Sequence, residues 1–196
     1  MKKRMIVIGG TGIIGSAVAE ALEPKHEVIR ASRHGEVRAD LDDPASVDAL
    51  FASTGPIDAV VCVAQSGTLT PIDSDRWDED FDLGMKKLTG QVALFRRAIR
   101  SLKDNGSITL TSGTFKEPMV GSAVGHIVNS GLEGFVRAAA VELPRGIRAN
   151  VVSPGWVRET LAKLGMDPSA GTPASEVARA YAAAIEGDLQ GRILTP

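Results

Sequence analysis

The feature that most limits the possible folds is the N-terminal stretch MIVIGGTGIIGSAVAE, residues 5–20. Apolar, mostly β-branched residues at its start predict a buried strand, and apolar positions at helical spacing after residue 12 predict a helix. Glycines fill the junction, where the chain must turn sharply. A strand, a glycine loop and a helix in direct succession are typical of the first half of a βαβ unit.

The same loop has the properties of a phosphate site. Without Cβ atoms the backbone can approach a pyrophosphate closely, and a helix N-terminus offers free N–H groups and partial positive charge. A flexible glycine-rich turn without a ligand is the alternative. We predict that a dinucleotide binds here, at Gly9, Thr11, Gly12, Ile13, Ile14 and Gly15.

The rest of the chain alternates short apolar runs with longer helical segments, which is the pattern of a parallel α/β sheet covered on both faces. Strands are predicted at 5–9, 27–31, 57–64, 107–112, 147–153 and 191–195. Helices are predicted at 12–22, 45–51, 75–102, 124–143 and 174–186. The expected fold is a Rossmann-like, doubly wound parallel sheet in three layers, forming a single domain over residues 1–196.

One connection is unusually short. Only four residues, SRHG, separate the strand at 27–31 from the extended segment at 36–39. A parallel crossover needs about a dozen residues. The segment is therefore expected to be an edge segment or a loop, and not a parallel neighbour of 27–31.

Composition excludes several classes of partner. A net charge of −2 without a basic stripe gives no reason to expect nucleic acid or an anionic membrane. No apolar run approaches the roughly 18 residues of a membrane span, and the apolar stretch after MKKRM is too short for a signal peptide. Cys62 is the only cysteine, so no disulfide and no metal site are predicted, and cytoplasm is the expected location.

The second strand indicates which dinucleotide binds. In such folds an acidic residue about 20 positions after the loop binds the ribose of NAD, whereas arginine accommodates the 2′-phosphate of NADP. Here the strand ends in Arg30, Ala31, Ser32 and Arg33, without a carboxylate. Ser32 can donate a hydrogen bond and Arg33 can pair with a phosphate, so NADP is predicted, with NAD possible. The alternative is that Arg30 and Arg33 are surface cations only.

With these motifs, the sequence resembles the short-chain dehydrogenase/reductase family over nearly its whole length. ADLDDPASV resembles the family's Asp-hydrophobic motif, which implies that Asp40 and Leu41 contact the adenine. VVCVAQSG resembles its Asn-Asn-Ala-Gly strand end. NVVSPGWVRET resembles the segment beside the nicotinamide and the phosphates. The resemblance adds cofactor contacts at Ala64, Gly67, Pro154, Gly155, Val157 and Thr160.

The residues that carry the family's chemistry are replaced. The family uses Tyr-x-x-x-Lys, in which the lysine lowers the tyrosine pKa and the tyrosine exchanges a proton with the substrate. Alignment through NSGLEGFVRAAAVEL places Gly125 at the tyrosine position and Asn129 at the lysine position. Gly113 takes the place of the usual serine, and Gly84 that of the supporting asparagine.

Three residues are candidates for what remains of catalysis. Ser112 lies one step before the usual serine position, and Asn129 can still bind ribose hydroxyls. His126 follows the tyrosine position, about 100° away around the helix, and is the candidate proton donor. Tyr181 is the only tyrosine, and its helix near the C-terminus favours a packing role.

Three functions are consistent with this pattern. The first is an NADP(H)-dependent oxidoreductase that transfers hydride to or from a small carbonyl or alcohol substrate, since hydride transfer needs mainly positioning. The second is an inactive NADP(H) sensor or regulator, and the third is a structural subunit. The resemblance also implies a homodimer or homotetramer formed through the helices at 75–102 and 124–143, with Gly131 and Gly134 permitting close approach.

Overall fold

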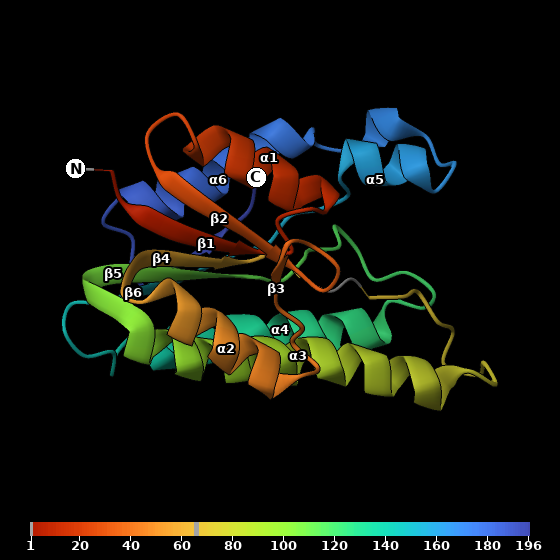
Figure 1. Cartoon of the computed structure of the whole chain (residues 1–196). Coiled ribbons are helices and arrows are strands. Elements are labelled where there is room, and N and C mark those ends of the chain that lie inside the picture. Colours follow the sequence, from red (N-terminus) through yellow and green to blue (C-terminus); the bar gives the residue numbers. More distant parts are fainter. Residues whose placement is uncertain (1, 65–66) are drawn as a thin grey trace.

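The structure, a computed structural model, describes residues 2–64 and 67–196. The described residues form one parallel sheet of seven strands in the order β3-β2-β1-β4-β5-β6-β7 (Figure 1). The strands are β1 (Arg4–Ile8), β2 (Glu27–Ser32), β3 (Val37–Arg38), β4 (Ile57–Cys62), β5 (Leu102–Thr111), β6 (Arg148–Val152) and β7 (Ile193–Leu194).

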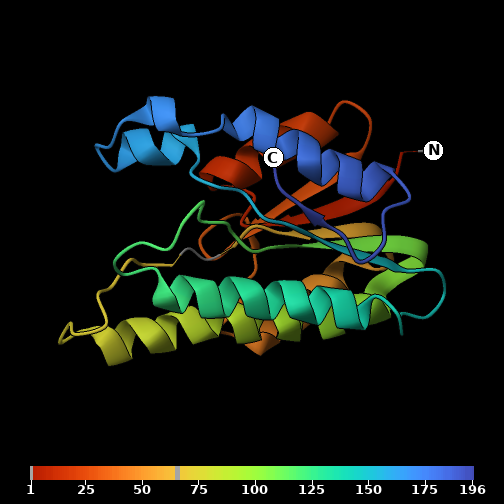
Figure 2. The ribbon, with the colours of Figure 1, turned by 180° about the vertical axis from the view of Figure 1, so that it is seen from behind.

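Helices cover both faces of the sheet, as predicted. Helices α1 and α6 lie on one face, and α2, α3 and α4 lie on the other (Figures 1 and 2). The helices are α1 (Ile13–Leu22), α2 (Pro44–Thr54), α3 (Trp77–Ser101), α4 (Ala123–Ala139), α5 (Arg158–Lys163) and α6 (Ala174–Glu186), with a 3₁₀ turn at Pro168–Ala170. No helix within the described ranges is long and apolar enough to cross a membrane.

The continuous apolar character of the strands follows from this burial on both faces. Alternate side chains of a strand point to opposite faces. In β1, Met5 and Val7 pack toward α1 and α6, whereas Ile6 and Ile8 join the larger core under α2, α3 and α4. Tyr181 is fully buried in the core on the α1–α6 side, and its hydroxyl lies 2.6 Å from Thr111 Oγ1. This burial raises the pKa of Tyr181, which agrees with the predicted packing role.

Strand β3 forms where the sequence predicted that the segment at 36–39 would not pair in parallel with 27–31. Val37 pairs with Ala31, and Arg38 with Ser32, in parallel register. The minimum crossover length applies to a connection that must return along a whole strand. Here the loop returns only far enough to align two residues at the sheet edge, so four residues suffice. The segment lies at the edge of the sheet, as one alternative had it, but the prediction that it is not a parallel neighbour of 27–31 was wrong.

Several helix ends differ from the predicted ones for local reasons. Helix α2 runs from Pro44 to Thr54, whereas residues 45–51 were predicted, and it starts at Pro44 because the Asp43 side chain accepts hydrogen bonds from the Ala45 and Ser46 backbone N–H groups. Helix α4 ends at Ala139, four residues before the predicted end. Helix α5 was not predicted, since its six residues are too few to show a helical period.

Glycines in α3 and α4 bring these two helices together within the chain. A Cβ atom on Gly84 would lie 2.5 Å from Val124 Cγ1, and one on Gly131 would lie 3.1 Å from Leu88 Cδ2. The close approach at Gly131 is therefore intramolecular, which differs from the expected contact with a second subunit. A Cβ on Gly134 would meet nothing within 4 Å.

Candidate cofactor and active site

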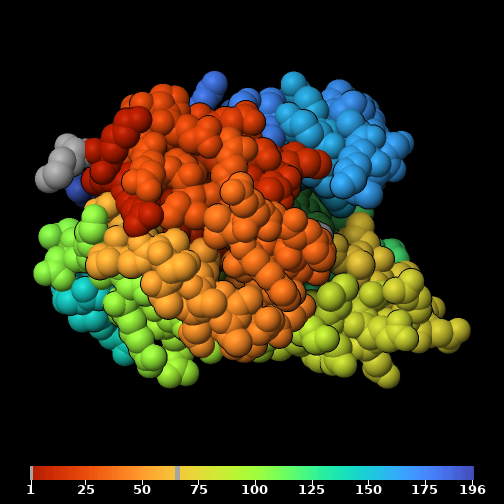
Figure 3. All heavy atoms as spheres, viewed as in Figure 1, coloured from red at the N-terminus to blue at the C-terminus, as the bar shows by residue number. Residues whose placement is uncertain are grey.

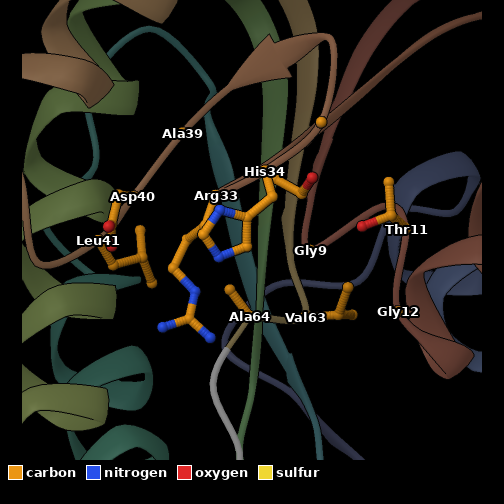
Figure 4. A pocket seen from close by; sticks show the side chains of 12 residues that line it. Gly9, Thr11, Gly12, Arg33, His34, Ala39, Asp40, Leu41, Val63 and Ala64 are labelled. Carbon is orange, nitrogen blue, oxygen red and sulfur yellow. The ribbon is translucent and has the colours of Figure 1, made fainter.

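A cavity of about 370 Å³ lies at the C-terminal ends of β1, β2 and β4 (Figure 4). The sheet order reverses here, since the chain moves from β1 outward to β2 and then back to β4, and open α/β sheets bind ligands at such a point. The N-terminal segment and the residues after β2 lie side by side at the front surface (Figure 3). The cavity is lined by Gly9, Thr11, Gly12, Ser32, Arg33, His34, Gly35, Ala39, Asp40, Leu41, Val63 and Ala64.

The glycines of the first loop have different roles. Gly9 has a φ of +82°, and a Cβ there would lie 2.9 Å from the Ala64 backbone nitrogen. A Cβ on Gly15 would overlap the Gly9 carbonyl oxygen. Both positions therefore require glycine for the turn itself. Gly12 has an ordinary φ of −81°, and its nearest contact would be Gly9 O at 3.3 Å, so Gly12 is left open toward the cavity.

The N-terminus of α1 is free to receive an anion. Gly12 is its N-cap, no side chain accepts a hydrogen bond from the first turn, and that turn contains no acidic residue. Ile13 and Ile14 direct their side chains against the core on the α1–α6 side, which leaves their backbone N–H groups as the contacts for a phosphate. The loop therefore fits the pyrophosphate predicted from the sequence.

The structure distinguishes the two arginines of the second strand. Arg30 forms an ion pair with Glu23 at 2.8 Å. Arg33 lines the cavity, where its guanidinium group extends beside Ala64, and it forms no ion pair with any described residue (Figure 4). His34 also lines the cavity and was not predicted. Only one of the two arginines is thus available to a ligand in the cavity.

Asp40 and Leu41, for which the resemblance implies adenine contacts, line the cavity on the side across from Thr11 and Gly12 (Figure 4). Ser46 holds this segment, because its hydroxyl contacts the Asp40 backbone nitrogen at 2.9 Å and the Asp40 carbonyl oxygen at 3.1 Å. Ala64 also lines the cavity, whereas Gly67 does not. The cavity thus brings together predicted residues from the ends of β1, β2 and β4.

The predicted contacts that follow β6 lie outside this cavity. The Thr114 N–H donates to the Pro154 carbonyl oxygen at 2.9 Å, which places Pro154 and Gly155 beside the end of β5. Val157 is 4% exposed and packs into the core, so only its backbone can face a ligand. Thr160 lies within α5. These residues are on the far side of the switch point from Arg33.

Phe115 packs against Gly125, the residue that the alignment places at the family's tyrosine position. A Cβ atom on Gly125 would lie 3.0 Å from Phe115 Cε2. Asn129 lies over Gly113, since a Cβ on Gly113 would be 3.2 Å from Asn129 Nδ2. Gly125 and Gly113 are therefore each covered by a side chain of this chain, Phe115 and Asn129 respectively.

His126 faces a second hollow, of about 430 Å³. Its ring stacks on Phe115, with centroids 5.1 Å apart, and its Nδ1 lies 3.0 Å from the Ser122 carbonyl oxygen. A carbonyl oxygen only accepts, so Nδ1 carries the proton in this contact. The hollow is lined by Thr70, Pro71, Ile72, Asp73, Pro118, Met119, Val120, Gly121, Ser122, Ala123 and His126.

Glu133 is a site residue that sequence reasoning missed. Its Oε1 accepts hydrogen bonds from the hydroxyls of Ser112 and Ser153, each at 3.0 Å. The hydroxyl proton of Ser112 is therefore directed to Glu133 and not toward a substrate. The sequence feature that could have identified Glu133 is its position one helical turn after Asn129, on the same face of α4.

Comparison with known proteins agrees with this architecture. A family model described as enoyl-(acyl carrier protein) reductase matches residues 9–183. The solved structure of the protein lin1944 from Listeria innocua is 35% identical, with a TM-score of 0.90 and 98% of each chain covered. A small-chain dehydrogenase is 29% identical, with a TM-score of 0.84, over 100% of this chain and 96% of the other.

A further solved structure is described as a small-chain dehydrogenase in complex with NADPH. It is 27% identical, with a TM-score of 0.85, over 100% of this chain and 97% of the other. No curated protein matched the chain. Because the family model matches most of the chain and a relative is 35% identical over nearly its full length, the chain belongs to the short-chain dehydrogenase/reductase family.

Proposed function

We propose that this protein is an NADP(H)-dependent oxidoreductase that transfers hydride between the cofactor and a small carbonyl or alcohol substrate. The observation that carries the proposal is Arg33, a cation that pairs with no residue in the described part of the chain and lines the cavity formed by the glycine loop and the ends of β2 and β4. A guanidinium group is a bidentate partner for a 2′-phosphate. The structural neighbour in complex with NADPH supports the same choice of cofactor.

The chain's own residues have separate tasks in this proposal. The glycine loop and the α1 N-terminus hold the pyrophosphate, while Arg33 and Ser32 hold the phosphorylated ribose. Asp40 and Leu41 enclose the adenine. When bound, NADP(H) would supply or accept the hydride. Asn129, beside Gly113, offers an amide that can donate and accept hydrogen bonds at the reacting end.

A second function is favoured by one observation. Phe115 packs on Gly125 where the family has its proton donor, and Ser112 donates its proton to Glu133. A chain with this arrangement can bind the cofactor and turn over little, as an NADP(H) sensor would. A screen for NADPH oxidation across carbonyl and quinone substrates distinguishes the two, since a sensor binds NADPH and oxidises none of them.

The choice of NADP over NAD is tested by Arg33→Gln. Loss of hydrogen bonds between charged groups should raise the Kd of NADPH by about 10- to 150-fold, equivalent to about 1.5–3 kcal/mol. The Kd of NADH should change by less than about threefold. Both constants are measured by fluorescence titration.

The matched control is Arg30→Gln, which removes a cation already paired with Glu23. It should leave the affinity for NADPH nearly unchanged. Equal losses of NADPH and NADH affinity in the Arg33 variant would show that Arg33 does not bind the 2′-phosphate.

We also propose that the protein forms a homodimer or homotetramer through the outer faces of α3 and α4. Leu83 and Ile127 are 43% and 47% exposed there, and Gly134 leaves open space two turns from Ile127 on the same helix face. Sedimentation at tens of micromolar should show an oligomer, and Ile127→Glu should dissociate it. A wild-type protein that sediments as a monomer would refute the proposal.

A further inference from the structure

Lys87 is a lysine buried at the C-terminal edge of the sheet. It lies on α3 and is only 9% exposed. Its Nζ donates to the Ser112 carbonyl oxygen at 3.5 Å, the upper limit for a hydrogen bond. It makes no ion pair with any described residue. Its neighbour Lys86 is exposed.

The ammonium group is poorly satisfied for a buried charge. It has three N–H donors and uses one, at a long distance. Burial lowers the pKa of Lys87, because the charged form loses its hydration. An apolar side chain of similar length would avoid the cost of an unpaired buried charge. Lysine at this position therefore needs a partner that residues 2–64 and 67–196 do not provide.

Hydrogen bonding to the backbone at the end of β5 does not explain why residue 87 is a lysine. Gln91, one turn further along α3, already performs that task with a neutral side chain. Its Nε2 donates to the Thr111 carbonyl oxygen at 2.9 Å, and its Oε1 accepts from the Thr111 N–H at 3.0 Å. One neutral residue thus satisfies both backbone groups of Thr111, while Lys87 makes a single weak contact to the next residue.

The position of Lys87 indicates its partner. It contacts Ser112, and Asn129 of the neighbouring helix lies over Gly113, so both side chains reach consecutive residues after β5. A dinucleotide with its adenosine half between Arg33 and Leu41 and its pyrophosphate at α1 must extend across the switch point. Its other half then lies over the ends of β4 and β5.

We infer that the Lys87 ammonium binds the hydroxyl oxygens of the nicotinamide half of the dinucleotide, with Asn129 beside it. The inference rests on the proposed function and adds a residue to the site. Lys87 supplies from α3 a positive charge at the reacting end, where residue 129 on α4 is a neutral asparagine.

The test compares Lys87→Met with Lys86→Met, a matched change at the exposed neighbour. Two probes are used: NADPH, and 2′,5′-ADP, which lacks the nicotinamide half. Lys87→Met should raise the Kd of NADPH by about tenfold or more and change that of 2′,5′-ADP by less than about twofold. Lys86→Met should change neither. Without ligand, Lys87→Met should melt at a higher temperature than wild type, because an unpaired buried charge is removed.

Two results would overturn the inference. Unchanged NADPH affinity with a lower melting temperature would show that Lys87 only supports the β5 end. Equal weakening of both probes would place its effect outside the nicotinamide half. Lys87→Gln, which keeps two N–H donors without the charge, provides the same comparison if the methionine variant does not fold. Wild-type protein that binds neither probe would instead refute the proposed function, and this inference with it.

Discussion

Replacing Gly12 with valine is expected to abolish NADPH binding in a protein that remains folded. The backbone at Gly12 has an ordinary φ, and a Cβ there would be 3.3 Å from its nearest contact, so the fold can accept a side chain with a small shift. The valine methyl groups would then occupy the space through which a pyrophosphate approaches α1. We expect the Kd of NADPH to rise by at least about 100-fold, or about 2.7 kcal/mol.

The measurement combines fluorescence titration with circular dichroism, so that lost binding is separated from lost structure. Gly9 and Gly15 are unsuitable for this purpose, because the turn itself requires glycine at both. Ala183→Val is the control, since it adds the same methyl groups at an exposed position of α6, outside the loop and outside the faces of α3 and α4. A folded Gly12→Val protein that binds NADPH within about threefold of wild type would show that the phosphates do not contact this loop.

The second prediction concerns turnover. Without a phenol at residue 125, reduction of an activated ketone should be about 10²- to 10⁴-fold slower than with general acid catalysis. Gly125→Tyr with Asn129→Lys restores the family pair, but the new Cβ would lie 3.0 Å from Phe115 Cε2. We therefore expect the triple variant that also contains Phe115→Ala to raise turnover by about tenfold or more.

Phe115→Ala alone is the control for that experiment and should give no gain. Steady-state NADPH oxidation measures all the variants. Wild-type turnover of several per second, together with a loss of about 100-fold or more in His126→Ala, would instead identify His126 as the proton donor. The His126 ring stacks on Phe115 and its Nδ1 contacts the Ser122 carbonyl oxygen, so we expect His126→Ala to retain wild-type rates.

Most of the fold could be predicted because it depends on local patterns. The last four residues of strand β1 are all apolar, since Met5 and Ile6 enter different cores, and this pattern predicts a sheet covered on both faces. Errors arose where geometry between segments decides the outcome. The pairing of Val37 with Ala31 needs only a short return of the chain, and the role of Gly131 depends on the position of Leu88 in α3.

In the candidate site, too, some residues could be predicted from local sequence and others could not. The glycine loop and Arg33 follow from residue types near a strand end, so the sequence predicts them. The structure was needed to show that Arg30 is paired and Arg33 is not. Phe115, Glu133 and Lys87 were missed, because each acts through contacts between elements far apart in the sequence, which one sequence does not reveal.

Titration of the wild-type protein with NADPH and with NADH tests the account most directly. Binding can be followed by the change in cofactor fluorescence. It can also be followed by the melting temperature, because a ligand that binds only the native state raises its stability. We expect saturable binding with a lower Kd for NADPH than for NADH. No change in fluorescence or melting temperature with either cofactor at millimolar concentration would contradict it.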